Sequence, residues 1–175
     1  MKADNTPKLT VREVALMGIM TAILEVSVHL LAPLPNVEPV TLLVILYTLV
    51  LGKRVGYVLT AYILFEGFAY GFGLWWLSYL YIWPLLAVIA FLFRKRTSPW
   101  VFSIIAGSFG LCFGMLCALP YLFIGGPIAA FHWWVAGIPY DLMHCAANFI
   151  LCLAFFTPLL RLLKRLYSPA QNLRE

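Results

Sequence analysis

Charged residues are scarce in this chain of 175 residues: only 11% are Asp, Glu, Lys or Arg, whereas 63% are hydrophobic. A soluble globular domain usually has about 25% charged residues and about 45–50% apolar ones. With a mean hydropathy of +0.94, the chain has too few charges to cover a water-exposed surface. The scarcity therefore excludes an ordinary soluble domain, and it predicts one domain, residues 1–175, that has lipid as its main solvent.

Several motifs of well-defined chemistry are also missing from the sequence. No CxxC pair, no HExxH and no Gly-rich phosphate loop followed by Lys occurs, so no cofactor or bound nucleotide is expected. Internal repeats are absent as well. The four cysteines lie inside apolar segments and are expected to be free thiols that pack as small apolar side chains: Cys112, Cys117, Cys145 and Cys152.

What the chain does contain is a series of long apolar runs. A helix needs roughly 20 apolar residues to cross the hydrocarbon core of a bilayer. Six segments meet or approach this length: residues 12–31, 39–51, 55–72, 74–93, 100–119 and 138–163. The sequence therefore predicts an all-α, polytopic membrane protein with a bundle of six transmembrane helices, in which residues 120–137 form a long outer loop.

The twelve basic residues stand in only five places between these runs: Lys2/Lys8/Arg12, Lys53/Arg54, Arg94/Lys95/Arg96, Arg161/Lys164/Arg165 and Arg174. The loops that alternate with these places contain no Lys or Arg. Because Lys and Arg concentrate in the cytoplasmic loops of membrane proteins, the pattern predicts that both ends of the chain are cytoplasmic. It also explains the net charge of +5 without a nucleic-acid partner.

Ionisable residues inside membrane helices are rare and are functional hypotheses by default. Here they fall in the predicted outer halves of the helices. Asp141, His144 and Asn148 have the spacing i, i+3, i+7, which places them on one helical face. Glu25 and His29 share a face of the first helix, and Glu66 lies beyond the midpoint of the third. The simpler alternative is that these groups pair with one another and hold the helices together.

Aromatic residues follow the same pattern on the fourth predicted helix. Trp76, Tyr79 and Trp83 repeat the spacing i, i+3, i+7 in its outer half. Trp residues also gather at membrane interfaces, so Trp133 could serve only as an anchor. A site formed by these faces would be acidic, walled by rings and open to the outside, which suits a neutral or cationic ring compound.

Small residues mark a possible contact surface on the first helix. Ala15, Gly18 and Ala22 form one stripe, and small residues at such spacing let a second helix approach closely. The stripe could face a partner subunit or the last helix of the same chain. Gly110-xxx-Gly114 on the fifth predicted helix is expected to serve internal packing.

The chain resembles the substrate-binding S components of energy-coupling factor (ECF) transporters, the vitamin-uptake systems of prokaryotes. The resemblance rests on size, six spans with both ends inside, the small-residue stripe, segment 34–40 (LPNVEPV), and segment 137–144 (GIPYDLMH) with Asn148 beyond it. It implies that the chain binds a vitamin or related micronutrient in the cell membrane and that the stripe, with Gly18 in place of an Ala, contacts a transmembrane T subunit. Two cytoplasmic ATPases would complete the transporter, so the chain would not itself be an enzyme.

The resemblance and the spacing together give a set of expected substrate-binding residues: Asn36, Glu38, Glu66, Trp76, Tyr79, Trp83, Trp133, Asp141, His144 and Asn148. Two other functions remain open. A metal-dependent intramembrane enzyme could use His132, Asp141 and His144 as ligands with Glu66 as base. A channel or a purely structural membrane subunit would bind no small molecule saturably.

Overall fold

The structure is a computed structural model that describes residues 9–30 and 37–171. Throughout these ranges every regular element is a helix: α1 (Val11–Leu30), α2 (Val40–Leu51), the 3-10 helix η1 (Gly52–Arg54), α3 (Val55–Tyr70), α4 (Leu74–Leu92), α5 (Pro99–Cys117), α6 (Leu119–Ile124) and α7 (Gly126–Gln171). The prediction of an all-helical chain is confirmed. The first five predicted helices begin and end close to their expected positions.

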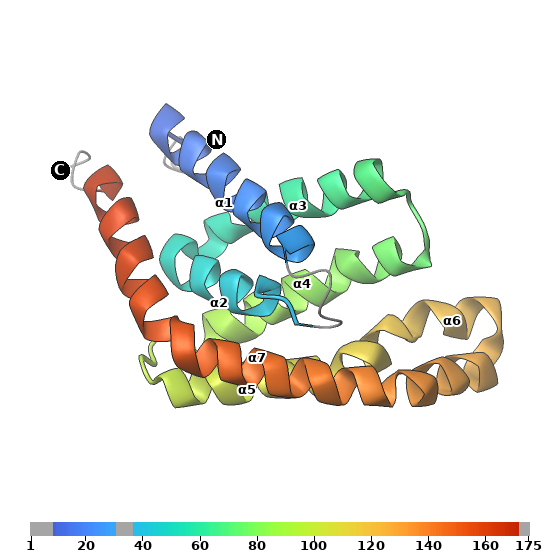
Figure 1. The fold of residues 1–175 in the computed structure, drawn as a ribbon. Helices are drawn as coiled ribbons and strands as arrows, with labels where there is room; N and C mark the ends of the chain where they lie inside the picture. The colour runs from blue at the N-terminus through green and yellow to red at the C-terminus, as the bar shows by residue number, and fades with distance from the viewer. Residues whose placement is uncertain (1–8, 31–36, 172–175) are drawn as a thin grey trace, which may run out of the picture.

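Five stretches of the described chain are long and apolar enough to cross a membrane: Val11–Leu30, Val40–Tyr70, Leu74–Leu92, Pro99–Ile124 and Gly126–Tyr167. One of them combines α2, η1 and α3, and the chain reverses direction between α2 and α3 (Figure 1). The 12 residues of α2 span only about 18 Å, less than the roughly 30 Å of a hydrocarbon core. The fold thus fits a multi-pass membrane protein in which the second predicted span is a half-length helix.

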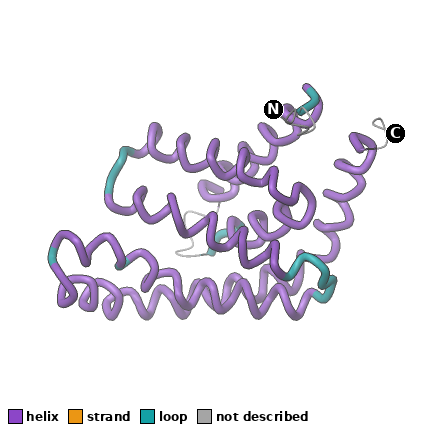
Figure 2. Tube along the Cα trace, turned by 180° about the vertical axis from the view of Figure 1, so that it is seen from behind, coloured by secondary structure: helices purple, strands orange, loops and turns teal. Residues whose placement is uncertain are grey.

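Helix α2 forms the centre of the bundle. Ten of its 12 residues are buried, and it contacts α1, α3, α4, α5 and α7. Around it, α3 and α4 form an antiparallel hairpin, and α5 runs side by side with α7 along the other edge of the molecule (Figures 1 and 2). Because α2 is apolar on all sides, it can be surrounded by helices on all sides.

The basic residues meet at one end of this bundle, which we call the basic end: the first turn of α1, η1, the α4–α5 loop and the last turns of α7 (Figures 1 and 2). Arg54 of η1 forms an ion pair there with the buried Glu13, and its guanidinium also lies 3.4 Å from the hydroxyl of Tyr167 on α7. Thr10 and Glu13 bond reciprocally as a capping box: the Thr10 N–H donates to Glu13 Oε2 over 2.8 Å, and the Glu13 N–H donates to Thr10 Oγ1 over 3.3 Å.

The predicted long loop over residues 120–137 is wrong. This segment forms α6 and the beginning of α7, which turn sharply at Gly125–Gly126, where Gly126 has a φ of +71°. Pro120 lies in the first turn of α6, where proline costs a helix little because that N–H has no partner inside the helix. The predicted helix 138–163 is therefore the middle of a 46-residue helix, about 69 Å long, which bends in its last third, a stretch that contains Pro158 (Figure 1).

Candidate functional site

The polar face of α7 is buried inside the bundle. Asp141, His144 and Asn148 have only 5%, 2% and 2% of their surface exposed. The face packs against α5 and α2: Asp141 Oδ1 accepts a hydrogen bond of 2.8 Å from the Gly114 N–H, and Asn148 Nδ2 donates one of 3.1 Å to Thr41 Oγ1. The predicted shared face of these three residues is confirmed.

Two glycines of α5 allow this close approach. A Cβ at Gly114 would lie 2.5 Å from Asp141 Oδ2, and a Cβ at Gly110 would lie 2.8 Å from the backbone carbonyl of His144. Real Cβ atoms do not tolerate such distances, so a side chain at Gly110 would push the backbone of α7 away from α5, and one at Gly114 would displace the Asp141 carboxylate. Gly110 and Gly114 therefore serve internal packing, as the sequence predicts, and they also place the polar face of α7.

Gly110→Ala is expected to lower the free energy of unfolding by about 1–3 kcal/mol, because overpacking strains the contact between α5 and α7. Gly137→Ala on α7 is the matched control, since its Cβ would have no atom within 4 Å. The control should raise stability by about 0.5–1 kcal/mol through helix propensity. Tryptophan fluorescence during denaturation in detergent measures both, and equal effects would contradict the close contact.

Several buried polar atoms of this region have no hydrogen-bond partner among the described residues: Asp141 Oδ2, His144 Nε2, Asn148 Oδ1 and Trp83 Nε1. An unsatisfied buried polar group costs about 1–3 kcal/mol, and native proteins contain few of them. Four such atoms on α4 and α7 are therefore a strong indication that something else, a ligand or water, completes their hydrogen bonding.

A second polar group lies between α1 and α3. Glu25 and Glu66 have 8% and 5% of their surface exposed and face each other closely enough to interact electrostatically. Beyond their contact with each other, both oxygens of Glu25 and Oε1 of Glu66 have no hydrogen-bond partner among the described residues. Glu38, just before α2, adds a third carboxyl within electrostatic reach of Glu66. The region is acidic, as the sequence predicts.

His29 lies within electrostatic reach of Glu66, and both of its ring nitrogens have partners. Its Nδ1 lies 2.8 Å from the backbone oxygen of Glu25, and its Nε2 is hydrogen-bonded to the Tyr70 hydroxyl at the end of α3. Through the Tyr70 hydroxyl, His29 therefore ties α1 to α3.

Aromatic rings connect the two polar groups. Tyr62 stacks on Tyr79 with ring centroids 6.2 Å apart, and Tyr79 meets Trp83 edge to face at 5.4 Å. Trp83 in turn contacts Phe113 at 5.8 Å, and Phe113 lies 4.9 Å from the His144 ring. Tyr79 is within electrostatic reach of Glu38 and Glu66. We call this combination of acids, rings and the α7 face the acidic–aromatic site.

The acidic–aromatic site lies far from the basic end. Along the helix axes, Glu66 is about 18 Å from Arg54, and Trp83 is about 16 Å from Arg94. On α7, Asp141 precedes Arg161 by 20 residues, about 30 Å. The separation of basic and acidic halves that the sequence predicts is therefore present in three dimensions.

Two of the expected site residues have partners outside the acidic–aromatic site. Trp76 donates from Nε1 to the Ile63 carbonyl over 2.8 Å, so its indole N–H is already occupied by α3. Trp133 is exposed on the hairpin of α6 and α7, where it stacks on Tyr121 with centroids 4.2 Å apart. Asn36 lies outside the described residues.

The structure does not bring the three suggested metal ligands together. His132 is exposed on the α6–α7 hairpin, about 13 Å along α7 from Asp141. Over residues 9–30 and 37–171, no three His, Cys, Asp or Glu side chains are grouped as a metal would require. The geometry therefore gives no support to a metal centre at His132, Asp141 and His144.

Sequence reasoning missed some residues of the site. Tyr62 precedes Glu66 by four residues and so shares its helical face, which is a signal that could have identified it. Phe113 and Thr41 carry no comparable signal, because their places depend on how α5 and α2 pack against α7.

The small-residue stripe of α1 is exposed. Ala15, Gly18 and Ala22 lie on its outer surface, and a Cβ at Gly18 would have no atom within 4 Å. Within the described chain the stripe is therefore not covered by α7 or another helix. The sequence left open whether the stripe faces a partner subunit or the last helix of the same chain, and the structure does not pack it against that helix.

A comparison of the chain with models of known protein families, with curated proteins and with solved structures finds no match. Function must therefore be inferred from the side chains themselves.

Proposed function

We propose that the chain is the membrane-embedded substrate-binding subunit of an ECF-type uptake transporter. The observation that carries this proposal is the acidic–aromatic site, where buried polar atoms on α1, α3, α4 and α7 lack partners in the described chain and border a series of rings. Apolar surroundings with a few convergent polar groups are typical of small-molecule sites. The proposal is that a bound substrate, and not ordered water, completes the hydrogen bonding of these atoms.

The membrane topology we propose has six crossings, with α2 passing only partway through the bilayer. The beginning of α1 and the end of α7 lie at the same end of the molecule, which favours an even number of crossings. The Lys and Arg residues at that end favour a cytoplasmic orientation for it, in the cell membrane. The acidic–aromatic site then faces the outside, where an uptake system meets its substrate.

The substrate class follows from the charges of the site. Glu25, Glu38 and Glu66 contribute three carboxyls, and the Lys and Arg side chains that the structure describes are at the far end of the bundle. A dianionic ligand would have no cation to neutralise it. Stacking on Tyr79 and Trp83 favours a flat ring, so we propose a vitamin-like compound that is neutral or cationic.

The partners of the transporter would dock on α1. The exposed stripe of Ala15, Gly18 and Ala22 lets a helix of a T subunit approach the backbone closely. Two ATPase subunits would supply the energy, since the sequence contains no phosphate-binding loop of its own.

The test of this function is mass spectrometry of small molecules that co-purify with the detergent-extracted chain. We expect one ring-containing, neutral or cationic compound, released on unfolding and bound again saturably. Tight binding of a dicarboxylate such as phthalate, together with no binding of aromatic cations such as benzyltrimethylammonium, would contradict the proposed substrate class.

Binding of a permanent aromatic cation is expected to strengthen with pH. Burial, together with the nearby Glu66 carboxyl, raises the pKa of Glu38 from 4.5 to about 7. With this pKa, about half of Glu38 is ionised at pH 7 and about a tenth at pH 6, so affinity should fall by up to about fivefold between pH 7 and pH 6. Titration calorimetry measures this dependence.

Glu38→Gln is the control, and it should flatten the pH dependence. The raised pKa of Glu38 also makes stability depend on pH. Because the folded state holds the Glu38 proton more tightly than the unfolded state does, the free energy of unfolding of the ligand-free protein should fall as pH rises from about 4.5 to 7. A pH profile that is unchanged in Glu38→Gln would contradict the assignment to this carboxyl.

A further inference from the structure

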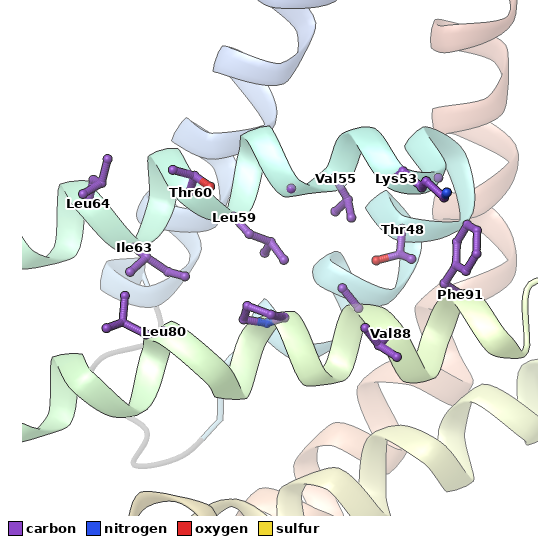
Figure 3. A pocket seen from close by; sticks show the side chains of 14 residues that line it. Thr48, Lys53, Val55, Leu59, Thr60, Ile63, Leu64, Leu80, Val88 and Phe91 are labelled. Carbon is purple, nitrogen blue, oxygen red and sulfur yellow. The ribbon is translucent and has the colours of Figure 1, made fainter. Parts of the chain in front are cut away.

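An apolar groove runs between α3 and α4 on the outside of the bundle, toward the basic end. It has a volume of 510 Å³. Figure 3 shows Leu64 and Leu80 at one end of it and Lys53 and Phe91 at the other. Gly56 forms part of its wall, and a Cβ there would have no atom within 4 Å, so the groove is open at this point.

The shape of the groove fits an extended chain. From Lys53 to Leu64 the groove follows about 16 Å of α3. An extended hydrocarbon chain is narrow enough to lie in the groove.

The chemistry of the groove also fits a lipid tail. Its walls are mainly apolar. The Thr48 hydroxyl donates a hydrogen bond of 2.7 Å to the Val44 carbonyl of its own helix, so it does not need a partner in the groove. No carboxylate lines it. The one charge at its end is Lys53, which is exposed and forms no ion pair with any described residue.

A second hollow flanks the same helix. It has a volume of 870 Å³, lies on the α1 side of α3 and shares Lys53, Gly56, Thr60 and Leu64 with the groove. Arg54 also lines the second hollow, where it is paired with Glu13. Two mainly apolar hollows that meet at Lys53 match the form of a diacyl lipid, which has two tails and one head group.

We propose that this surface of α3 is a binding site for an anionic phospholipid, with an acyl chain in the α3–α4 groove and the phosphate at Lys53. The site is separate from the acidic–aromatic site and requires only that the chain lies in a membrane. Lipid of this charge would hold the basic end at the membrane face, because each Lys near an anionic surface strengthens attraction about fivefold.

Native mass spectrometry of the delipidated full chain, titrated with phosphatidylglycerol or phosphatidylcholine of identical acyl chains, tests the site. We expect phosphatidylglycerol to bind about fivefold more tightly. Lys53→Gln should remove that preference, whereas the control Lys164→Gln, on the same end but outside the groove, should keep it. Gly56→Leu fills the groove and should reduce binding of both lipids at least tenfold, whereas Ile104→Phe, exposed on α5, should not.

Val88→Phe provides an independent block from the α4 wall, and it should act like Gly56→Leu. Equal losses in Lys53→Gln and Lys164→Gln would overturn the head-group assignment in favour of unspecific charge. Undiminished lipid binding in both groove-filling variants would overturn the site. A dimer of the chain that these variants dissociate would likewise overturn it, by making a second copy the occupant.

Discussion

Glu66→Gln is expected to weaken binding of a cationic ring compound by about 10- to 100-fold and, at the same time, to raise the stability of the ligand-free protein. Hydrogen bonds to a charged group contribute about 1.5–3 kcal/mol, which corresponds to this loss of affinity. In the empty site, however, a buried carboxyl whose Oε1 has no described partner is a cost that the neutral amide reduces. Ligand titration and thermal unfolding, both followed by tryptophan fluorescence, measure the two effects.

Two tryptophans of α4 provide a matched control. The indole N–H of Trp83 has no partner among the described residues, whereas that of Trp76 donates to the Ile63 carbonyl. Both substitutions remove apolar volume, but only Trp76→Phe also breaks a hydrogen bond, which should cost it about 1 kcal/mol more, whereas only Trp83→Phe should weaken ligand binding. If both variants lost stability equally and neither changed binding, the orphaned polar atoms of the site would have no ligand-binding role.

Arg54→Gln is expected to have the largest effect on stability, a loss of about 3 kcal/mol in the free energy of unfolding. Its guanidinium pairs with Glu13, which is 1% exposed, so the substitution removes a cation from a buried carboxylate. It also removes the link from η1 to Tyr167, through which α1, the α2–α3 turn and α7 are joined at the basic end. Denaturation in detergent measures the loss.

The neighbouring Lys53→Gln is the control for Arg54→Gln. Lys53 is exposed, so its loss should change stability by less than about 0.5 kcal/mol. The double variant Glu13→Gln/Arg54→Gln should recover part of the loss, because the buried charge is then gone. Equal effects of Lys53→Gln and Arg54→Gln would mean that the Glu13–Arg54 pair does not hold the helices together.

The sequence could predict the helices that end at strong local signals. Three such signals end apolar segments, and tertiary contacts do not override them. They are the glycine and basic residues after α2, the glycines between α3 and α4, and the Arg94–Arg96 run after α4. The shared face of Asp141, His144 and Asn148 on α7 could also be predicted, because helical periodicity alone places the three side chains together.

Other features depend on packing and could not be predicted in this way. Pro120, Gly125, Gly126 and Pro127 indicate a loop, but each lies where a helix begins or turns, so α6 and α7 continue through the segment. The central position of α2 has no local signal beyond its uniform apolarity. The meeting of Glu25 with Glu66, and of Trp83 with Phe113, results from contacts between helices that no spacing within one helix encodes.

Uptake from outside requires that the acidic–aromatic site face away from the cytoplasm and that the basic end face toward it. Two fusions at the carboxyl end measure this directly: a fluorescent protein that matures only in the cytoplasm and a phosphatase that is active only outside. We expect a fluorescent first fusion and an inactive second one. An active phosphatase with a dark fluorescent fusion would place the acids, rings and His144 on the cytoplasmic side, and an uptake role for this site would be contradicted.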